Sequence, residues 1–368
     1  MMKVAVAGYS TTKFSLDDAP IEGLLFSATK QLFENTRNLS QKDIDAVLVS
    51  TNENKKYLAP VLSELAGITP KISHSVENLC SSGTNTIVSA FSYVSAGLAD
   101  VVLVAGAERS DNPGQVLDWD VSRGEFQHPI FWGSMFAKAH KRKFGTTEEE
   151  IAYVSAKNHR NAQDNPAAYG TKTYTIDEIM NSKRLTDDLR VLDCSRSCTG
   201  SSAVLLVSER VAKKFTDSPI WISGIGQKTT SASFTKNDLT KLDSTKDAAR
   251  QAYAMSGVDP NQVDVAEIHD AFSICEIMVL EELGFVQKGK AGKLVTELYE
   301  TNSKKINPRG GLIGAGHPLG ATGIAQVAEI ASQLQKNSSK RQVDNPRVGL
   351  VQYMSAAATS STVLVLKS

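Results

Sequence analysis

Short runs of Val, Ile, Leu and Ala alternate along the chain with longer stretches in which apolar residues recur at helical spacing. The short runs predict buried strands, and the longer stretches predict amphipathic helices that cover them. This alternation is typical of an α/β protein. No apolar run approaches the ~18 residues of a membrane span, so we expect a chain that does not cross a membrane.

The order of these elements occurs twice. Each copy begins with a strand that ends in glycine and continues with a helix, a polar turn and a second strand. A glycine-rich turn, a helix of small residues and two further strands complete each copy. The matching segments are 3–10 and 219–227, 23–50 and 246–270, 78–108 and 314–336 with 347–356, and finally 201–209 and 360–368. Two duplicated βαβαβ-type halves are the simplest interpretation of this repeat.

A long insertion interrupts the first copy between its third and final strands. The insertion covers residues 116–200, and an unstructured loop of that length is uncommon inside a compact fold. We therefore expect the insertion to be a lid or substrate domain. A dimerisation flap without ligand contact is the alternative. The predicted division is a first half of 1–115 with 201–217, an inserted loop domain of 116–200, and a second half of 218–368.

The composition narrows the class of protein. The 368 residues suffice for about two domains, and 40 Lys and Arg balance 40 Asp and Glu. Without net charge or a basic arm, nucleic acid is not an expected partner. The sequence begins without a secretory signal pattern, and four cysteines are too few for a disulfide framework, so we expect a cytoplasmic protein. Cys194 and Cys198 have the spacing of half a metal site, but no second ligand pair follows, so no metal is expected.

Cys80 is the strongest candidate nucleophile. It lies in the sequence NLCSSG, residues 78–83, directly before a stretch with helical spacing. A thiol at a helix N-terminus faces unpaired backbone N–H groups and the positive end of the helix dipole, and both favour the thiolate. We therefore expect a lowered pKa at Cys80 and nucleophilic chemistry through its thiol. A buried structural cysteine is the alternative.

The repeat pairs Cys80 with a histidine. Cys80 precedes Gly83 by three residues, and His317 precedes Gly320 by three residues in the equivalent turn of the second half. If a pseudo-twofold axis relates the halves, the two helix N-termini meet, and His317 can take the proton of the Cys80 thiol. His269 ends the second strand of the second half, where ligand sites of α/β proteins gather, and is placed to donate a hydrogen bond to a thioester oxygen. For each histidine taken alone, a structural role is the alternative.

The chain resembles the thiolase family over essentially its whole length. The resemblance rests on NLCSSG around Cys80, on HDAF at 269–272, and on the run from Gly310 to Gly323 that contains GHPLGATG. HDAF and the sequence HPIFWGSMFAKAHKRKFGTT in the insertion are similar to sterol-carrier-type and archaeal thiolases. The resemblance implies a five-layered α-β-α-β-α thiolase fold, acyl-CoA and CoA as substrates, no cofactor, and a homodimer or a dimer of dimers.

The resemblance also implies roles for individual residues. Cys80 corresponds to the acylated nucleophile, His317 to its base, and His269 to the donor for the oxyanion or enolate. The residues expected at the substrate are Gly316, Phe272 and Ala356.

Two places depart from the family pattern. Many thiolases carry a second catalytic cysteine in a Cys-x-Gly-Gly-Gly turn or in HDCF, whereas here these places hold Met354-Ser355-Ala356-Ala357-Ala358 and Ala271. Because that thiol exchanges the α-proton of acetyl-CoA, the carbon–carbon step is the part of the reaction in question. Three alanines also restrict a turn whose backbone N–H is expected to help hold the acyl oxyanion. Cys275 is a candidate replacement acid, and an ordinary core position is the alternative.

Three functions remain open. The first is a thiolase-type acyltransferase that forms acetoacetyl-CoA from two acetyl-CoA or cleaves it. The second is a decarboxylating ketosynthase-like enzyme with a Cys-His-His set. The third is a non-condensing acyl-CoA-binding subunit, because similar archaeal thiolases are associated with a hydroxymethylglutaryl-CoA synthase through a zinc-ribbon/OB-type bridging protein. The basic residues that fit either a CoA phosphate site or a solvated helix face are Lys138, Lys141, Arg142 and Lys143.

Overall fold

The first half of the chain alternates strands with helices, as its apolar pattern predicts. The computed structural model describes residues 2–110 and 124–368. The elements of the first half are β1 (Val4–Thr11), α1 (Ile21–Asn35), β2 (Ala46–Ser50), α2 (Leu58–Leu65), β3 (Ile72–Val76), α3 (Ser82–Ser95), β4 (Val101–Glu108) and β5 (Gly200–Ser208). The helices between β4 and β5 are α4 (Ile130–Phe144), α5 (Glu148–Ala162) and α6 (Ile176–Met180).

The second half repeats this arrangement after the short helix α7 (Ala212–Phe215). Its strands are β6 (Ile220–Thr229), β7 (Val265–Glu267), β8 (Val348–Ser355) and β9 (Ser360–Lys367). Its helices are α8 (Asp243–Ser256), α9 (Ser273–Glu282), α10 (Ala291–Glu300), α11 (Gly311–Ala315) and α12 (Leu319–Leu334).

The described strands form one sheet in the order β3-β2-β4-β5-β1-β6-β9-β8-β7. The halves join where β1 pairs antiparallel with β6, through Ala5 with Trp221 and Val6 with Ile220. Outward from this seam, β5, β4 and β2 on one side follow the same order as β9, β8 and β7 on the other. The pair β2 and β4 is parallel, like its counterpart β7 and β8. The strand order confirms the predicted repeat, whereas the boundaries of the three predicted segments stay a prediction.

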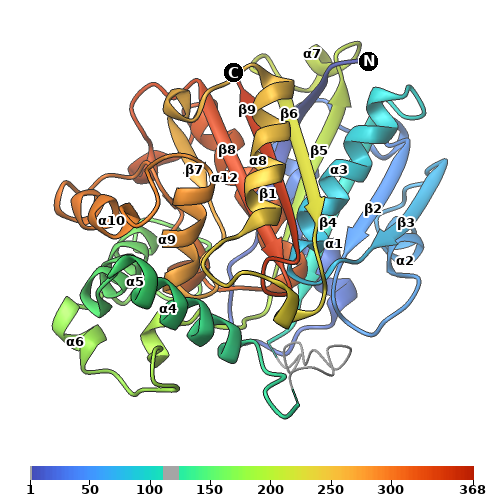
Figure 1. Cartoon of the computed structure of the whole chain (residues 1–368). Coiled ribbons are helices and arrows are strands. Elements are labelled where there is room, and N and C mark those ends of the chain that lie inside the picture. The colour runs from blue at the N-terminus through green and yellow to red at the C-terminus, as the bar shows by residue number, and fades with distance from the viewer. Residues whose placement is uncertain (1, 111–123) are drawn as a thin grey trace.

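Both faces of the central strands are buried, which explains their continuous apolar sequences. In β4, Val102 and Val104 pack into a middle core, while Leu103 between them packs into an outer core. The middle core contains α3 and α12. Helices α1 and α2 cover the outer face of the first half, and α8 and α9 cover the outer face of the second (Figure 1). The strands of the first half and the strands of the second half both pack on the middle core and are the two β layers, so the helices and strands form the predicted five-layered α-β-α-β-α arrangement.

The insertion folds into helices that lie against the second half (Figure 1). Helix α4 ends at Gly145, which has a left-handed φ of 74°, and α5 begins at once behind Thr147. The Thr147 hydroxyl caps α5 by accepting a hydrogen bond from Glu150 N–H. Helix α5 packs against α9, α10 and α11. In the part of the chain that the structure describes, no helix has the length and hydropathy of a membrane span.

Candidate active site

Cys80 lies at a tight turn between β3 and α3. In the 3-10 segment Leu79–Ser81, Leu79 has a left-handed φ of 50°. The Ser82 hydroxyl accepts a hydrogen bond from Asn78 N–H at 2.9 Å and donates one to Leu79 O at 2.6 Å. These local bonds hold Cys80 at the N-terminal end of α3, the place that the sequence predicts.

The N-terminal ends of α3 and α12 lie in contact. A Cβ on Gly83 would lie 3.1 Å from Ile324 N and 3.3 Å from Gly320 O. A side chain at Gly83 would therefore push the two backbones apart, which explains the glycine. Because the helices meet near their first residues, Cys80 and His317 reach the same cavity.

His317 lies between α11 and α12. Its backbone N–H donates to Arg196 O at 2.9 Å. Its Nδ1 lies 2.9 Å from Thr322 Oγ1 and 3.4 Å from the Tyr353 hydroxyl. Burial, and to a smaller extent the positive charge of Arg309, lower the pKa of His317 to about 3. The imidazole is therefore neutral near pH 7 and can accept a proton.

His269 follows β7 and faces the same cavity. Its backbone N–H donates to Gln352 Oε1 at 3.1 Å. Its ring stands edge-on to Tyr353 at 4.6 Å and to His317 at 6.0 Å between ring centroids. Burial, and then the neighbouring His317, lower the pKa of His269 well below its ordinary value, so this imidazole is also neutral. A neutral imidazole carries one N–H, which can serve as a hydrogen-bond donor.

One cavity of about 280 Å³ brings most of the predicted site together. Its lining residues include Cys80, His269, His317, Phe272 and Ala356, all predicted from the sequence. Gly316 is not among them, because it packs behind the wall: a Cβ there would lie 2.7 Å from Cys198 Sγ. The insertion contributes the apolar wall of Ile130, Trp132, Phe136 and Leu185.

The expected lowering of the Cys80 pKa is wrong. Burial raises the pKa of the Cys80 thiol to about 12, and the carboxylates of Glu108 and Glu77 act in the same direction. Loss of hydration of the thiolate outweighs the favourable helix N-terminus. The pKa values of Cys194, Cys198 and Cys275 are also raised to about 12 by burial, so acidity does not single out Cys80. Cys80 is therefore a thiol in the resting site and needs a base.

The turn that follows β8 holds alanine where the family pattern has glycine. Ala356, Ala357 and Ala358 all adopt left-handed backbone conformations, with φ of 49°, 58° and 57°. Such a conformation costs about 1–2 kcal/mol per non-glycine residue, because Cβ approaches the following carbonyl oxygen. The turn thus keeps a shape suited to glycine in spite of its sequence. Strain of this kind is common at functional sites.

The places of the expected second thiol face the cavity with apolar side chains. Ala271 and Met354 both line it. Cys275 lines the same cavity, one helical turn after Ala271, so it is not only a core residue. Cys194 also lines the cavity, which the sequence analysis missed because its spacing to Cys198 suggested only a metal half-site. Among the described residues, no group of three or more His, Cys, Asp or Glu side chains could hold a metal ion.

A buried polar network supports the two histidines from behind. The Asp270 carboxylate accepts hydrogen bonds from Leu312 N–H at 2.6 Å and Asn158 Nδ2 at 2.7 Å. Asn158 also donates to Glu276, which pairs with Lys157 at 3.0 Å. Burial, and then the Glu276 carboxylate, raise the pKa of Asp270. Asp270 therefore connects the segment of His269 to the start of α11, which precedes His317.

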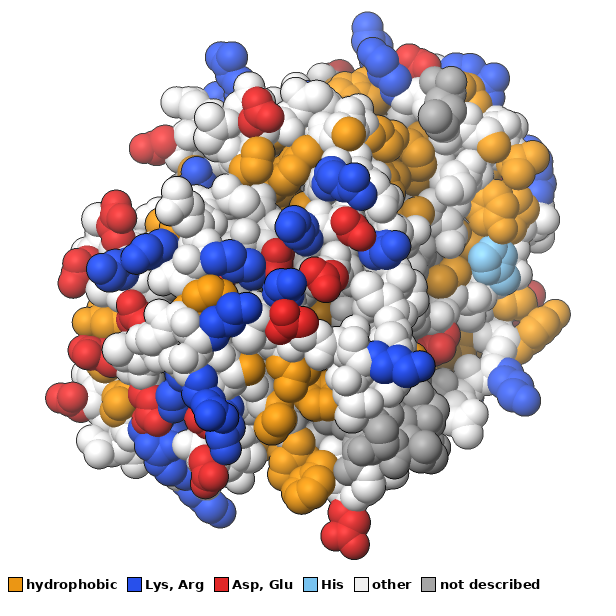
Figure 2. All heavy atoms as spheres, viewed as in Figure 1, with side chains coloured by type: hydrophobic (Ala, Val, Ile, Leu, Met, Phe, Trp, Pro, Cys, Tyr) orange, Lys and Arg blue, Asp and Glu red, His pale blue; other side chains and the backbone are white. Residues whose placement is uncertain are grey.

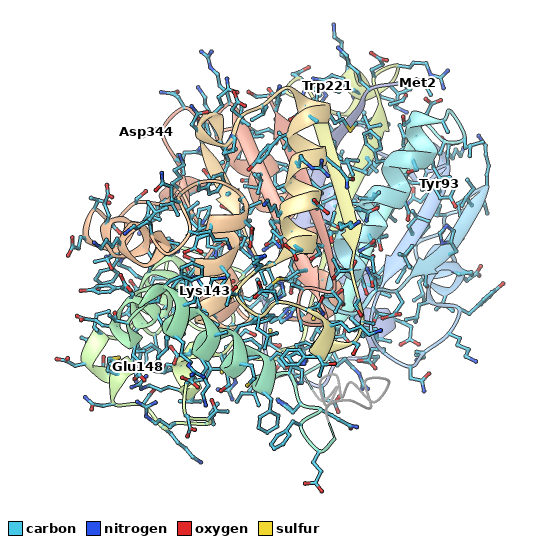
Figure 3. The ribbon with its side chains drawn as sticks, viewed as in Figure 1. Met2, Tyr93, Lys143, Glu148, Trp221 and Asp344 are labelled. Atoms are coloured by element: carbon cyan, nitrogen blue, oxygen red, sulfur yellow. The ribbon has the colours of Figure 1, made fainter. Side chains whose placement is uncertain are left out.

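The basic residues of α4 are partly engaged in ion pairs. Lys141 Nζ lies 3.0 Å from Glu148 and 3.1 Å from Asp188, and Lys143 Nζ donates to Thr240 Oγ1. Lys143 and Glu148 are labelled in Figure 3 on the side of the molecule where α4 and α5 lie. Figure 2 shows blue and red side chains interspersed on this face, which is typical of a solvated surface. A CoA phosphate site at these residues stays a prediction.

Tyr353 and Thr322 are site residues that the sequence analysis missed. Tyr353 is fully buried on β8, and Thr322 is fully buried in the first turn of α12. The signals in the sequence were a tyrosine within an apolar strand, which is more often a core residue, and the place of Thr322 in the run GHPLGATG, five residues after His317.

Comparisons with known proteins identify the family. The thiolase N-terminal domain family matches residues 4–210, and the thiolase C-terminal domain-like family matches residues 226–368. The acetyl-CoA acetyltransferase of Methanothermobacter thermautotrophicus is 34% identical over 385 aligned residues, covering 99% of each chain. Sterol carrier protein 2 of Oryctolagus cuniculus is 36% identical over 300 residues, covering 75% of this chain and 55% of that protein.

Solved structures share the fold at lower identity. A structure described as the Ltp2-ChsH2(DUF35) aldolase matches with a TM-score of 0.87 and 23% identity, over 100% of this chain and 98% of that chain. Human mitochondrial 3-ketoacyl-CoA thiolase in complex with CoA matches with a TM-score of 0.76 and 19% identity, with the same coverage. Together with the two domain matches and the near full-length relative, these findings place the chain in the thiolase family.

Proposed function

We propose that the protein is a thiolase-type acyltransferase that carries an acetyl group from a CoA thioester on Cys80. The observation that carries this proposal is the meeting of Cys80, His269 and His317 in one cavity at the ends of α3, α12 and β7. A half-buried thiol beside two neutral imidazoles has the nucleophile, the base and the donor that acyl transfer requires.

The proposed first step is acylation. His317 takes the Cys80 proton, and the sulfur attacks the thioester carbonyl carbon. Backbone N–H groups of Cys80 and of the left-handed turn at Ala356 are the proposed oxyanion donors. When the tetrahedral intermediate collapses, the carbon–sulfur bond to CoA breaks, and the departing CoA thiolate takes the proton that His317 received from Cys80.

The proposed second step resolves the acyl-enzyme. In condensation, the deprotonated α-carbon of a second acetyl-CoA attacks the acetyl carbonyl carbon, acetoacetyl-CoA forms, and Cys80 leaves as the thiolate. In thiolysis, Cys80 is instead acetylated by attack on the 3-keto carbon of acetoacetyl-CoA: the bond from that carbon to the α-carbon breaks, and the α-carbon takes up the proton that Cys80 released and leaves as acetyl-CoA. Free CoA then gives its thiol proton to His317 and takes the acetyl group, and the Cys80 thiolate that leaves regains this proton. His269 is the proposed donor to the enolate oxygen of the second substrate. The condensation also needs a group that removes the α-proton, at the place where Ala271 and Met354 line the cavity.

Intact-protein mass spectrometry after incubation with acetyl-CoA or acetoacetyl-CoA tests the proposal. The wild type should gain one acetyl group, and Cys80→Ala should gain none. Cys194→Ala is a matched control, because Cys194 lines the same cavity but has no proposed role in acylation, and it should acylate normally. Acylation that survives in Cys80→Ala would overturn the assignment of the nucleophile. Consumption of malonyl-CoA in place of acetyl-CoA would favour the decarboxylating ketosynthase alternative.

A partner-dependent subunit is a second candidate, favoured by the absence of a thiol at Ala271 and Met354. The description of one structural neighbour names a DUF35 partner in an aldolase. By analogy, we propose a zinc-ribbon/OB-type partner and a hydroxymethylglutaryl-CoA synthase as candidate assembly members. Normal acylation of Cys80 with carbon–carbon chemistry only after addition of the partner would support this candidate.

We also propose a homodimer or a dimer of dimers. In the sheet of the described residues, β3 is an edge strand, so one side of its backbone is available for pairing with a second chain. Light scattering coupled to size-exclusion chromatography measures the mass directly, and a monomer at micromolar concentration would contradict this proposal.

A further inference from the structure

The Nδ1 atom of His317 lies between two buried hydroxyl groups. Thr322 Oγ1 is 2.9 Å away, and the Tyr353 hydroxyl is 3.4 Å away. Thr322 and Tyr353 are fully buried, and His317 is almost so. In the part of the chain that the structure describes, Nε2 of the same ring makes no protein hydrogen bond. The two ring nitrogens therefore have different surroundings.

The hydrogen bonds of Thr322 decide which ring nitrogen carries the proton. A threonine hydroxyl has one hydrogen and two acceptor lone pairs. Thr322 Oγ1 donates that hydrogen to Pro318 O at 2.8 Å, one turn back in α12. Toward His317 it can then only accept, so Nδ1 must be the protonated nitrogen. A neutral imidazole has a single N–H, which leaves the lone pair on Nε2.

We infer that Thr322 is a positioning residue that holds His317 as the Nδ1–H tautomer, so that Nε2 is the proton acceptor for Cys80. The inference rests on the proposed function, because it assigns the base of the acylation step. Without Thr322, either nitrogen can carry the proton, and only one of the two tautomers has a lone pair on Nε2.

Tyr353 completes this arrangement. Its hydroxyl lies 3.4 Å from Nδ1 of His317, the same ring nitrogen that Thr322 Oγ1 contacts at 2.9 Å. The ring of Tyr353 also stands edge-on to the ring of His269, at 83° between the ring planes. Tyr353 is therefore a second and more distant neighbour of Nδ1, and the hydrogen bond that Thr322 donates to Pro318 O sets the tautomer.

Nitrogen NMR tests the tautomer without any enzymatic assay. The chain has six histidines, so protein labelled with ¹⁵N-histidine gives few ring signals, and His317→Gln assigns those of His317. At pH 7 we expect Nδ1 of His317 to be pyrrole-type and Nε2 to be pyridine-type. The reverse pattern in the wild type would overturn the inference directly, with no dependence on how a variant folds.

Variants at Thr322 link the tautomer to the chemistry. Thr322→Val should give a mixture of tautomers and slow Cys80 acylation by about 10- to 100-fold, since the wrong tautomer of a catalytic base removes its function. Thr322→Ser keeps the hydroxyl and should have both the Nδ1–H tautomer and the acylation rate of the wild type. The matched control is Thr86→Val, because Thr86 is equally buried and donates to Ser82 O at 2.7 Å in α3 without touching a histidine. It should leave the His317 signals and the acylation rate unchanged.

The two proposals fail in different ways. If the wild type has the Nδ1–H tautomer but Cys80 does not acylate, the proposed acyltransferase is wrong and the tautomer assignment stands. If Cys80 acylates but Thr322→Val keeps the wild-type tautomer and rate, the positioning role of Thr322 is wrong. An equal loss of rate in Thr86→Val and Thr322→Val, with unchanged His317 signals, would also overturn it, because the loss would then be structural.

Discussion

Alkylation of Cys80 should rise steadily with pH and show no plateau through the neutral and mildly alkaline range. Burial raises the pKa of Cys80 to about 12 from an ordinary value of 9.0. Below both values, the thiolate fraction is about 10³-fold smaller than that of an ordinary thiol, and it grows about tenfold for each pH unit. Because the thiolate is the species that reacts with iodoacetamide, the alkylation rate should follow this fraction.

The assay measures the rate of iodoacetamide labelling at Cys80 by peptide mapping from about pH 7 to about pH 10. N-acetylcysteine in the same buffers supplies the reference thiol, whose rate should level off where its own pKa is passed. Cys80 should react before Cys198, because Cys80 lines the cavity whereas Cys198 is fully buried. Prior incubation with acetyl-CoA should protect Cys80 if it forms the proposed acyl-enzyme.

A plateau with a midpoint near or below about pH 8 would refute this reasoning. It would mean that the helix N-terminus and His317 outweigh burial, and that Cys80 is a resting thiolate, as its sequence context alone suggests. His317→Gln distinguishes the two cases further. If His317 stabilises a resting thiolate, its removal lowers the alkylation rate, whereas a neutral resting thiol beside a neutral imidazole should show little change.

Three further predictions concern the missing thiol, the strained turn and the buried ion pair. Ala271→Cys should accelerate the carbon–carbon step by about 10²–10⁴-fold without changing the acylation rate. Condensation by the wild type should show a primary isotope effect with trideuteroacetyl-CoA. If the isotope effect is absent, another group already moves the α-proton. Ala357→Gly should raise the free energy of unfolding by about 1 kcal/mol in urea titrations, since glycine removes the strain of an alanine with left-handed φ. Ala232→Gly is the control: Ala232 is exposed and has no positive φ, so this substitution should not stabilise the protein. Lys157→Met should lower the free energy of unfolding by about 3–5 kcal/mol, because it leaves the Glu276 carboxylate buried without its ammonium partner. A loss below about 1 kcal/mol would show that the hydrogen bonds from Asn158 and Asn307 are enough to stabilise that carboxylate.

The meeting of Cys80 with His317 could be predicted because it follows from the repeat, whereas the five layers were implied by the resemblance to the thiolase family. Two equivalent helices that begin with a glycine-rich turn must lie at equivalent places in two equivalent halves. The contact of Gly83 with the backbone of α12 then brings the two N-termini together. This meeting required no side-chain detail, which is why the pattern of apolar residues and glycines was sufficient to predict it.

The pKa of Cys80 and the support of the histidines could not be predicted in this way. The direction of a pKa shift depends on how completely a thiol is removed from water, and the wall that does so comes from distant segments such as Trp132 in the insertion. Tyr353 contacts His317 from another element, and Thr322 contacts it from the first turn of the helix that follows, each through one side-chain contact. Such contacts depend on distances of a few tenths of an ångström, which periodicity and spacing do not contain.

The two parts of the proposed reaction depend on different features of this site. In the proposed mechanism, acyl transfer relies on the half-buried thiol of Cys80, on the neutral His317 and on the left-handed turn at Ala356. Proton transfer at the α-carbon of acetyl-CoA relies on a side chain at the place of Ala271 or Met354, and neither residue carries a thiol. Three alanines retain the left-handed turn although each costs about 1–2 kcal/mol in that conformation, which indicates that the shape of the turn matters more than its local strain. A site that keeps the strained turn at Ala356, the proposed oxyanion donor, while Ala271 and Met354 stand at both places of the second thiol fits the proposed acyl-enzyme better than the carbon–carbon step. Besides Cys80, the thiols that line the cavity among the described residues are those of Cys275 and Cys194, so a thiol that serves the carbon–carbon step has to be one of these two.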